Sequence, residues 1–323
     1  MYLCRFCSAE QDESELEMDA QHKGYWCVYC DGYTYLNNTD NVHRFILVME
    51  EKKTQTHRPP PLKHKFRSQL SLLRYPGSKG KVIASLSELI VQKHTKRLVS
   101  PYTGGGSVEL ALLAAGMVKE LHLNDYDFGV YSLFYLIKNN PHPLIHWIAN
   151  FTPTHDKFFE ARKIIKDKYK DQDLFGAALS LLVVNRLAFS GIYKANPLGG
   201  RNGDQNSLLS RWNPLNLIER IKFIHQMSKN ITITNDDACE VIEEAYWENR
   251  TTLYIDPPYV KAGKDLYLHY YDKRDHIRLN VLLESLYHGM PGADIVLTYD
   301  DDPLITELYQ YPEIFKLARR YSI

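Results

Sequence analysis

Short apolar runs that end near an acidic residue recur from about residue 97 onward, and they constrain the fold of this 323-residue chain more than any other feature. Stretches with helical periodicity separate these runs. The runs with their acids are Leu121–Leu123 before Asp125, Ile231–Ile233 before Asp236 and Asp237, Leu253–Ile255 before Asp256, and Ile295–Leu297 before Asp300. Strand, loop and helix in alternation predict a largely parallel α/β sheet. Because such sheets bind ligands at the carboxyl ends of their strands, the acids are candidates for one common site.

A further apolar run, Arg97–Val99, leads into the glycine-rich turn Gly104–Gly106 and then into a helix predicted over Val108–Ala115. Glycine permits close approach of a ligand to the backbone, and the start of the helix presents free N–H groups. Asp125 comes 21 residues after Gly104, where an acid at the next strand end binds a ribose diol. These features predict a nucleotide-type site and leave NAD and S-adenosylmethionine as alternatives.

The residues Asp256, Pro257, Pro258 and Tyr259 follow the run Leu253–Ile255. They fit the methylation of an exocyclic amine, which is a poor nucleophile when its lone pair is delocalised into a ring. The Asp256 carboxylate and the Pro257 carbonyl are acceptors for the two amine N–H bonds, and Pro258 has no N–H to compete for them. Tyr259 offers an aromatic face to the base. The rival interpretation is a proline-rich turn after a strand.

The interval between Asp125 and Ile231 holds about a hundred residues, where one crossover helix would be enough. We expect an inserted helical subdomain there, with helices over 154–169, 173–189 and 207–228, the last interrupted at Pro214. A glycine-rich loop, residues 190–203, lies inside it and carries two cations. Such a loop is expected to meet a DNA backbone or base edges.

Four of the five cysteines form two pairs, each bracketing two residues. The pairs are Cys4 with Cys7 and Cys27 with Cys30. This spacing is typical of a four-thiolate zinc site, so we predict that residues 1–48 form a small zinc ribbon with a structural metal ion. Residues 49–67, which are basic and contain three consecutive prolines, are predicted to be a linker.

Charge and hydropathy narrow the class of protein. Lys plus Arg and Asp plus Glu number 39 each, so DNA contacts must come from local patches rather than from net charge. The longest apolar stretch, near Ala177–Val184, is much shorter than the roughly 18 residues of a membrane span, and the first residues are no secretory signal. We therefore expect a soluble, cytoplasmic protein without membrane contact.

Together with the upstream segment Arg74–Lys79, these motifs resemble those of the Dam-type family of DNA adenine-N6 methyltransferases, which use S-adenosylmethionine. From about Leu72 onward, four motifs occur in the order of that family: a Pro-Gly-x-Lys segment, the glycine turn, an inserted target-recognition region and Asp-Pro-Pro-Tyr. The resemblance implies a Rossmann-like methyltransferase sheet over 68–134 and 231–323, with a helical target-recognition subdomain over 135–230. It also implies a prokaryotic or phage source, double-stranded DNA as partner, and base flipping, because the amino group must leave the stack.

The resemblance further implies roles for individual residues. Lys79 and Gly104–Gly106 hold the methionine moiety of the cofactor, Asp125 the ribose and Asp237 the adenine. The predicted cofactor-binding residues are Tyr75, Gly77, Lys79, Pro101, Gly104, Gly105, Gly106, Ser107, Asp125, Asp237 and Asp256. The predicted catalytic residues are Asp256, Pro257, Pro258 and Tyr259. The predicted DNA-binding residues are Asn185, Arg186, Ser190, Tyr193, Lys194, Asn196 and Arg201. Residues 259–271 correspond to the mobile loop beside the target-base pocket.

Two features depart from the family pattern. Ser100 stands where the family often has an acid, and the sequence stops at Ile323, where relatives continue into a final strand or hairpin. We therefore expect a sheet that is incomplete or closed by a protein partner or second copy, for which the ribbon is another docking place. The alternatives in function are a cytosine-N4 methyltransferase, since the motif requires only an exocyclic amine, and a DNA-binding regulator without turnover.

Overall fold

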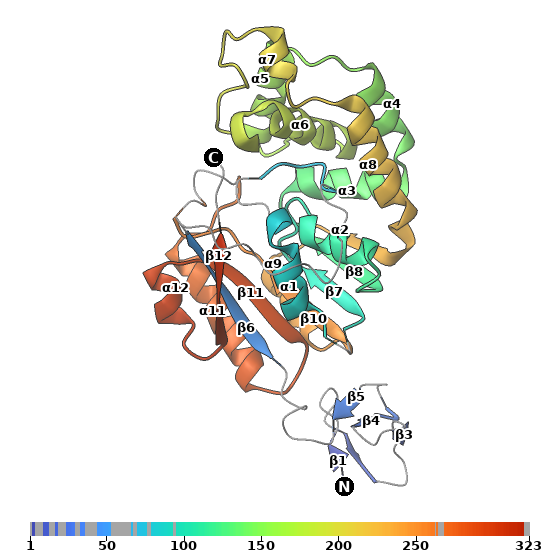
Figure 1. The fold of residues 1–323 in the computed structure, drawn as a ribbon, viewed down its shortest axis with the longest axis vertical. Coiled ribbons are helices and arrows are strands. Elements are labelled where there is room, and N and C mark those ends of the chain that lie inside the picture. The colour runs from blue at the N-terminus through green and yellow to red at the C-terminus, as the bar shows by residue number, and fades with distance from the viewer. Residues whose placement is uncertain are drawn as a thin grey trace.

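The structure is a computed structural model that describes residues 2–3, 9–12, 17–18, 24–29, 33–35, 44–52, 66, 70–75, 79–92, 95–261, 263 and 268–319. Its central element is a seven-stranded sheet in the order β12-β6-β11-β10-β7-β8-β9 (Figure 1). The strands are β6 (Phe45–Lys52), β7 (Arg97–Ser100), β8 (Glu120–Asn124), β9 (Ile231–Thr234), β10 (Thr251–Ile255), β11 (Asp294–Asp300) and β12 (Glu313–Arg319). All pairings in this sheet are parallel, so the carboxyl ends of its strands lie at one edge.

Each central strand is buried on both faces of the sheet, and its side chains alternate between two cores. Ile46 and Leu98 belong to the core beneath α1 and α2, whereas Leu47 and Val99 belong to the core beneath α9, α11 and α12. These helices are α1 (Ile83–Ile90), α2 (Ser107–Ala114), α9 (Ala238–Tyr246), α11 (Lys273–His288) and α12 (Pro303–Leu308). Burial on both faces is why the strands read as near-continuous apolar runs. The strands predicted from those runs are confirmed as β7 to β11.

A group of helices lies between β8 and β9 in the chain and gathers at one end of the molecule (Figure 1). They are α3 (Phe128–Asn139), α4 (His142–Asn150), α5 (His155–Lys166), α6 (Leu174–Leu187), α7 (Gln205–Leu209) and α8 (Pro214–Gln226), with short 3-10 turns η3 (Phe189–Gly191) and η4 (Ser228–Asn230). The helices predicted at 154–169, 173–189 and 207–228 are therefore confirmed, with Pro214 at the start of α8. The predicted boundary between residues 134 and 135 falls inside α3, which packs on β9 as well as on α6 and α8.

Strand β6 shows that the predicted boundaries near the N-terminus are wrong. The sequence interpretation places residues 45–48 in the ribbon and 49–52 in the linker, yet Phe45–Lys52 forms one strand between β11 and β12. The physical reason is that residues 45–49 are apolar in both alternating positions and are at most 3% exposed. Only a sheet covered on both faces buries such a run. Because β6 lies between β11 and β12, β12 is the edge strand on this side of the described sheet, and closure of the sheet by a partner stays a prediction.

Preceding β6, short antiparallel strands form two small sheets at the end of the molecule opposite α4 to α8 (Figure 1). They are β1 (Tyr2–Leu3), β2 (Glu10–Gln11), β3 (Glu17–Met18), β4 (Gly24–Trp26) and β5 (Tyr33–Tyr35). The guanidinium of Arg250, just before β10, lies 5.4 Å from the centre of the Trp26 ring. Among the predicted zinc ligands, Cys27 is described and buried, whereas Cys4, Cys7 and Cys30 lie outside the described residues.

Within the ranges given above, no helix combines the length and the apolar character that crossing a bilayer requires.

Candidate active site

A cavity of about 510 Å³ lies at the carboxyl ends of β7, β8 and β10 and brings most of the predicted site together. The predicted residues that line it are Tyr75, Lys79, Gly104, Gly105, Gly106, Ser107, Asp125, Asn185, Tyr193, Asp237, Asp256, Pro258 and Tyr259. The described residues that were predicted for the site but do not line the cavity are Pro101, Arg186, Ser190, Lys194, Asn196, Arg201 and Pro257. Gly77 lies outside the described residues. The glycine turn, the acid after β8 and the Asp-Pro-Pro-Tyr segment thus share one cavity.

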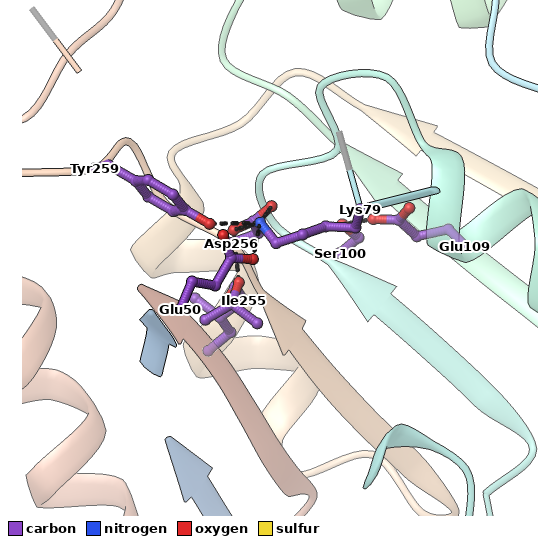
Figure 2. Close-up of polar contacts among 8 residues, drawn as sticks. Glu50, Lys79, Ser100, Glu109, Ile255, Asp256 and Tyr259 are labelled. Atoms are coloured by element: carbon purple, nitrogen blue, oxygen red, sulfur yellow. Dashed lines mark hydrogen bonds and ion pairs between the residues drawn. The ribbon is translucent and has the colours of Figure 1, made fainter. Parts of the chain in front are cut away.

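The ammonium group of Lys79 connects the Pro-Gly-x-Lys segment to the Asp-Pro-Pro-Tyr segment (Figure 2). Its Nζ donates hydrogen bonds to both carboxylate oxygens of Asp256, each at 2.7 Å, and to the Tyr259 hydroxyl at 2.6 Å. Lys79 is only 5% exposed, and an ammonium that deep in a protein requires such partners. The contacts hold Asp256 and Tyr259 in fixed positions at the cavity wall.

The neighbouring strand β11 fixes the Asp256 carboxylate from another side. Thr298 Oγ1 donates to Asp256 Oδ1 at 2.5 Å and lies 3.4 Å from the Ile255 carbonyl oxygen. The Asp256 side chain keeps 25% exposure, so it is held by two donors and still faces the cavity. Such a carboxylate is a preorganised acceptor for N–H groups that enter the cavity.

The glycine turn and the acid after β8 are joined directly. Gly104 and Gly106 have φ values of 49° and 61°, a left-handed conformation that side chains disfavour. The Gly104 N–H donates to Asp125 Oδ2 at 2.7 Å, and the Asp127 N–H donates to Asp125 Oδ1 at 2.9 Å. Burial, and to a lesser degree the nearby Asp127 carboxylate, raises the pKa of Asp125 to about 7.

Glu109, in the first turn of α2, is a cavity residue that the sequence interpretation missed. The Ser100 hydroxyl donates to its Oε1 at 2.7 Å (Figure 2). Burial raises the pKa of Glu109 to about 7, and the hydrogen bond from Ser100 acts in the opposite direction. The cavity therefore has an acid beside Ser100, supplied by α2. Its position two residues after Ser107, at a helix start next to the glycine turn, is the signal that would have found it.

Asp237, which also lines the cavity, accepts a hydrogen bond from the Cys239 N–H at 2.9 Å and caps the start of helix α9. The predicted mobile loop is described at residues 259–261, 263 and 268–271. Its residues 268–271 line the cavity, and the Tyr271 hydroxyl lies 2.6 Å from that of Tyr102. These tyrosines add an aromatic wall that the motifs did not predict.

Asn185 and Arg186 are buried and hold neighbouring backbone, and their predicted contact with DNA stays a prediction. Asn185 is 2% exposed, accepts from the Arg74 N–H at 2.7 Å, and donates to the carbonyls of Arg74 and Gly191 at 2.9 and 3.2 Å. Arg186 is 8% exposed and donates to the Arg211 carbonyl at 2.6 and 3.0 Å. Both residues tie the end of α6 to neighbouring backbone. The reason is that α6 is apolar nearly all round and is therefore buried on every side.

The loop that follows α6 has an exposed outer part. Ala188 pairs with Pro197 in an antiparallel bridge, and the Phe189 N–H donates to the Asn196 carbonyl at 2.9 Å. The predicted DNA-binding residues Lys194, Asn196 and Arg201 are exposed, Ser190 is half-buried, and Tyr193 turns to the cavity. Phe189, which was not predicted, is 53% exposed beside them.

The comparison with known proteins agrees with this geometry. A family model described as D12 class N6 adenine-specific DNA methyltransferase matches residues 75–323. The chain belongs to this family. As a D12 class N6-adenine DNA methyltransferase, it acts on adenine rather than on cytosine, and the family implies S-adenosylmethionine as methyl donor and DNA as substrate.

Curated relatives of the chain are also named as methyltransferases or methylases. The chain is 24% identical to the type II methyltransferase M.MjaIII of Methanocaldococcus jannaschii over 276 residues, which is 78% of this chain and 91% of the relative. It is 25% identical to the DNA N-6-adenine-methyltransferase of Escherichia phage P1 over 270 residues, 81% of this chain but only 34% of that protein. It is 24% identical to a DNA adenine methylase of Vibrio cholerae over 195 residues, 60% of this chain and 66% of the relative.

Proposed function

We propose that this D12 class methyltransferase binds a specific site in double-stranded DNA, turns the target adenine out of the helix, and methylates its N6 amino group within the cavity at the strand ends. The observation that carries this proposal is the Asp256 carboxylate, which accepts two N–H hydrogen bonds from Lys79 at 2.7 Å in a cavity that also contains the glycine turn. Its oxygens are already arranged to accept N–H donors.

In the proposed reaction, Asp256 and the Pro257 carbonyl accept the two N–H bonds of the target amine. This draws the nitrogen toward tetrahedral geometry and frees its lone pair. Tyr259, at the cavity wall, stacks on the extruded base. The amine nitrogen would attack the methyl group of a bound sulfonium directly as the carbon–sulfur bond breaks and leaves a thioether, and the excess proton on nitrogen passes to the Asp256 carboxylate or to solvent. No covalent bond between the enzyme and the base is required.

The cavity fits S-adenosylmethionine by size and by donor chemistry. Its volume of about 510 Å³ lies within the usual range for small-ligand sites. Gly104–Gly106 and Lys79 would hold the methionine moiety, Asp125 the ribose and Asp237 the adenine. When bound, the cofactor supplies an electrophilic methyl group on a sulfonium. Asp125 is suited to accept ribose hydroxyl donors because the Gly104 N–H already orients its carboxylate.

Cofactor binding is expected to weaken as the pH falls through about 7, the raised pKa of Asp125. The ribose hydroxyls donate to the ionised carboxylate, so protonation removes an acceptor and affinity falls by up to about tenfold per pH unit below that pKa. Calorimetry of S-adenosylmethionine binding between pH 6 and 8 measures this. Glu109 titrates in the same range, so Asp125→Asn and Glu109→Gln are compared in parallel. A slope in Asp125→Asn as steep as in the unaltered protein contradicts the assignment.

For DNA contact, we propose the exposed part of the loop after α6, with Lys194, Asn196 and Arg201, together with Ser190 and Tyr193. Polar and cationic side chains on an exposed loop beside a base pocket suit both phosphate and base-edge contacts. The helices α3 to α8 then form the target-recognition subdomain. The cytoplasm, where cellular DNA lies in prokaryotes, is the corresponding location.

The test of this function is transfer of labelled methyl from S-adenosylmethionine to unmethylated DNA, followed by nucleoside mass spectrometry. N6-methyladenine at one recurrent sequence is the expected product. N4-methylcytosine, or cofactor binding without any product across varied DNA, would overturn the proposal.

We also propose that Cys4, Cys7, Cys27 and Cys30 hold a structural zinc ion, and that the surrounding strands offer a surface for a protein partner. Cys27 follows β4, and its sulfur accepts a hydrogen bond from the Tyr29 N–H at 3.4 Å. Backbone donors of this kind stabilise metal-bound thiolates. Metal analysis of the purified protein is expected to find about one zinc per chain, lost in Cys27→Ser. A zinc content near zero in protein purified without chelators contradicts the proposal.

A further inference from the structure

Glu50 brings a second carboxylate to the Lys79 ammonium from outside the part of the chain that the family model covers. It lies near the end of β6 and pairs in register with Asp300 of β11 and Leu317 of β12. Because β6 runs parallel to its neighbours, its carboxyl end lies at the same sheet edge as that of β10, which Asp256 follows. The family match begins at residue 75, so the motifs give no role to this strand.

The Glu50 side chain is fully buried and lies 3.3 Å from the Lys79 ammonium. Figure 2 shows Glu50 and Tyr259 reaching that ammonium from different sides. A buried carboxylate carries a desolvation cost of several kcal/mol unless a cation compensates it. Asp256 alone would balance the single charge of Lys79. The chain nonetheless buries a second acid against the same cation, which points to a role beyond charge balance.

The number of donors on Lys79 shows what that role is. An ammonium has three N–H donors. The two oxygens of Asp256 and the Tyr259 hydroxyl lie 2.6 to 2.7 Å from it, and Glu50 Oε1 lies farther away, at 3.3 Å. An amine that enters the site adds a donor to a carboxylate that already accepts two hydrogen bonds from Lys79 and one from Thr298, so it competes with Lys79 for Asp256 and favours the release of one Lys79 bond. Glu50 is the neighbouring carboxylate that can accept the released N–H without exposing the ammonium to water.

We propose that Glu50 is a positioning residue for methyl transfer: it receives the Lys79 ammonium when the target amine binds Asp256. The N-terminal strand β6 is then part of the active site, although it precedes the matched family region. This inference rests on the proposed function, because it concerns the entry of the amine in that reaction.

The test compares Glu50→Gln with Asp294→Asn in the full chain. Gln keeps the size of Glu and an acceptor oxygen but loses the charge. Asp294 is as buried as Glu50. It begins β11, at the end away from the Glu50 partner Asp300, and it pairs with Arg44 at 3.6 Å. Melting temperature, S-adenosylmethionine affinity and methyl transfer at saturating DNA are measured for each.

We expect Glu50→Gln to lower kcat about tenfold, the value of one charge-assisted hydrogen bond, with cofactor affinity within about twofold of the unaltered protein. Asp294→Asn should retain full kcat. In a Lys79→Met background, Glu50→Gln should cause no further loss, because it acts through Lys79. Unchanged kcat in Glu50→Gln, or an equal loss in the Lys79→Met background, overturns this inference alone. Absence of N6-methyladenine with the unaltered protein overturns the proposed function and this inference with it.

Discussion

Replacing Asp256 with Asn should lower methyl transfer by about a thousandfold or more, while the affinity for S-adenosylmethionine changes by less than about threefold. Asn has nearly the size of Asp but only one acceptor oxygen. Its NH2 group would face either the Lys79 ammonium or the Thr298 hydroxyl, both of which donate to the carboxylate in the unaltered protein. The variant therefore loses the acceptor for the amine and the geometry of its neighbours.

The measurement is single-turnover methyl transfer with saturating DNA and cofactor, together with calorimetry of cofactor binding. Asp301→Asn is the matched control, because Asp301 is an exposed acid just beyond β11. A fall in cofactor affinity as large as the fall in rate would show that Asp256 serves cofactor binding. Retained turnover would eliminate it as the acceptor for the amine.

Replacing Asn185 with Ala should destabilise the protein by about 3 to 4 kcal/mol, because three buried backbone groups lose their hydrogen-bond partner. In a chain of this size, the melting temperature should fall by about 4 to 6 °C. The loss reaches two segments at once. Asn185 holds the backbone of Arg74, and it also holds Gly191, whose φ of 77° and close packing against the Arg74 carbonyl leave no space for a Cβ.

Thermal unfolding of Asn185→Ala and of Asn196→Ala gives the comparison, since Asn196 is an exposed Asn on the loop after α6. Asn196→Ala should leave the melting temperature within about 1 °C. DNA affinity, measured well below the transition, should be nearly unchanged in Asn185→Ala. The reverse pattern, with intact stability and weakened DNA binding, would support the interpretation of Asn185 as a DNA contact.

The sheet was largely predictable because strands buried on both faces leave a direct trace in the sequence. The apolar runs at Leu121, Ile231, Leu253 and Ile295 correspond to β8, β9, β10 and β11. Residues 45–49 show the same trace, an apolar run followed by an acid, Glu50. The sequence interpretation misses this strand because the run lies between a cysteine-rich segment and a charged, proline-rich segment. The predicted domain boundary rests on those two segments rather than on the apolar run itself.

The motifs predicted which residues meet at the cavity but not how they are held. The Asp-Pro-Pro-Tyr segment indicated Asp256, yet its donors Lys79 and Thr298 lie far from it in sequence. Contacts across such separations depend on strand order, which the motifs of one sequence do not reveal. Asn185 illustrates the converse case. Its residue type suggests a DNA contact, whereas its position in a helix that is apolar on all sides determines burial.

The place of β6 in the sheet has a consequence for biosynthesis. Its residue Phe45 pairs with Ile295, so about 250 residues must be made before the strand finds this neighbour. At the usual pace of about 5 to 20 residues per second, the apolar segment waits roughly 10 to 50 seconds on the ribosome without its partner. An unpaired strand of this kind is prone to aggregation. The nascent chain must therefore be shielded, by its own early helices or by a chaperone, until the C-terminal third emerges.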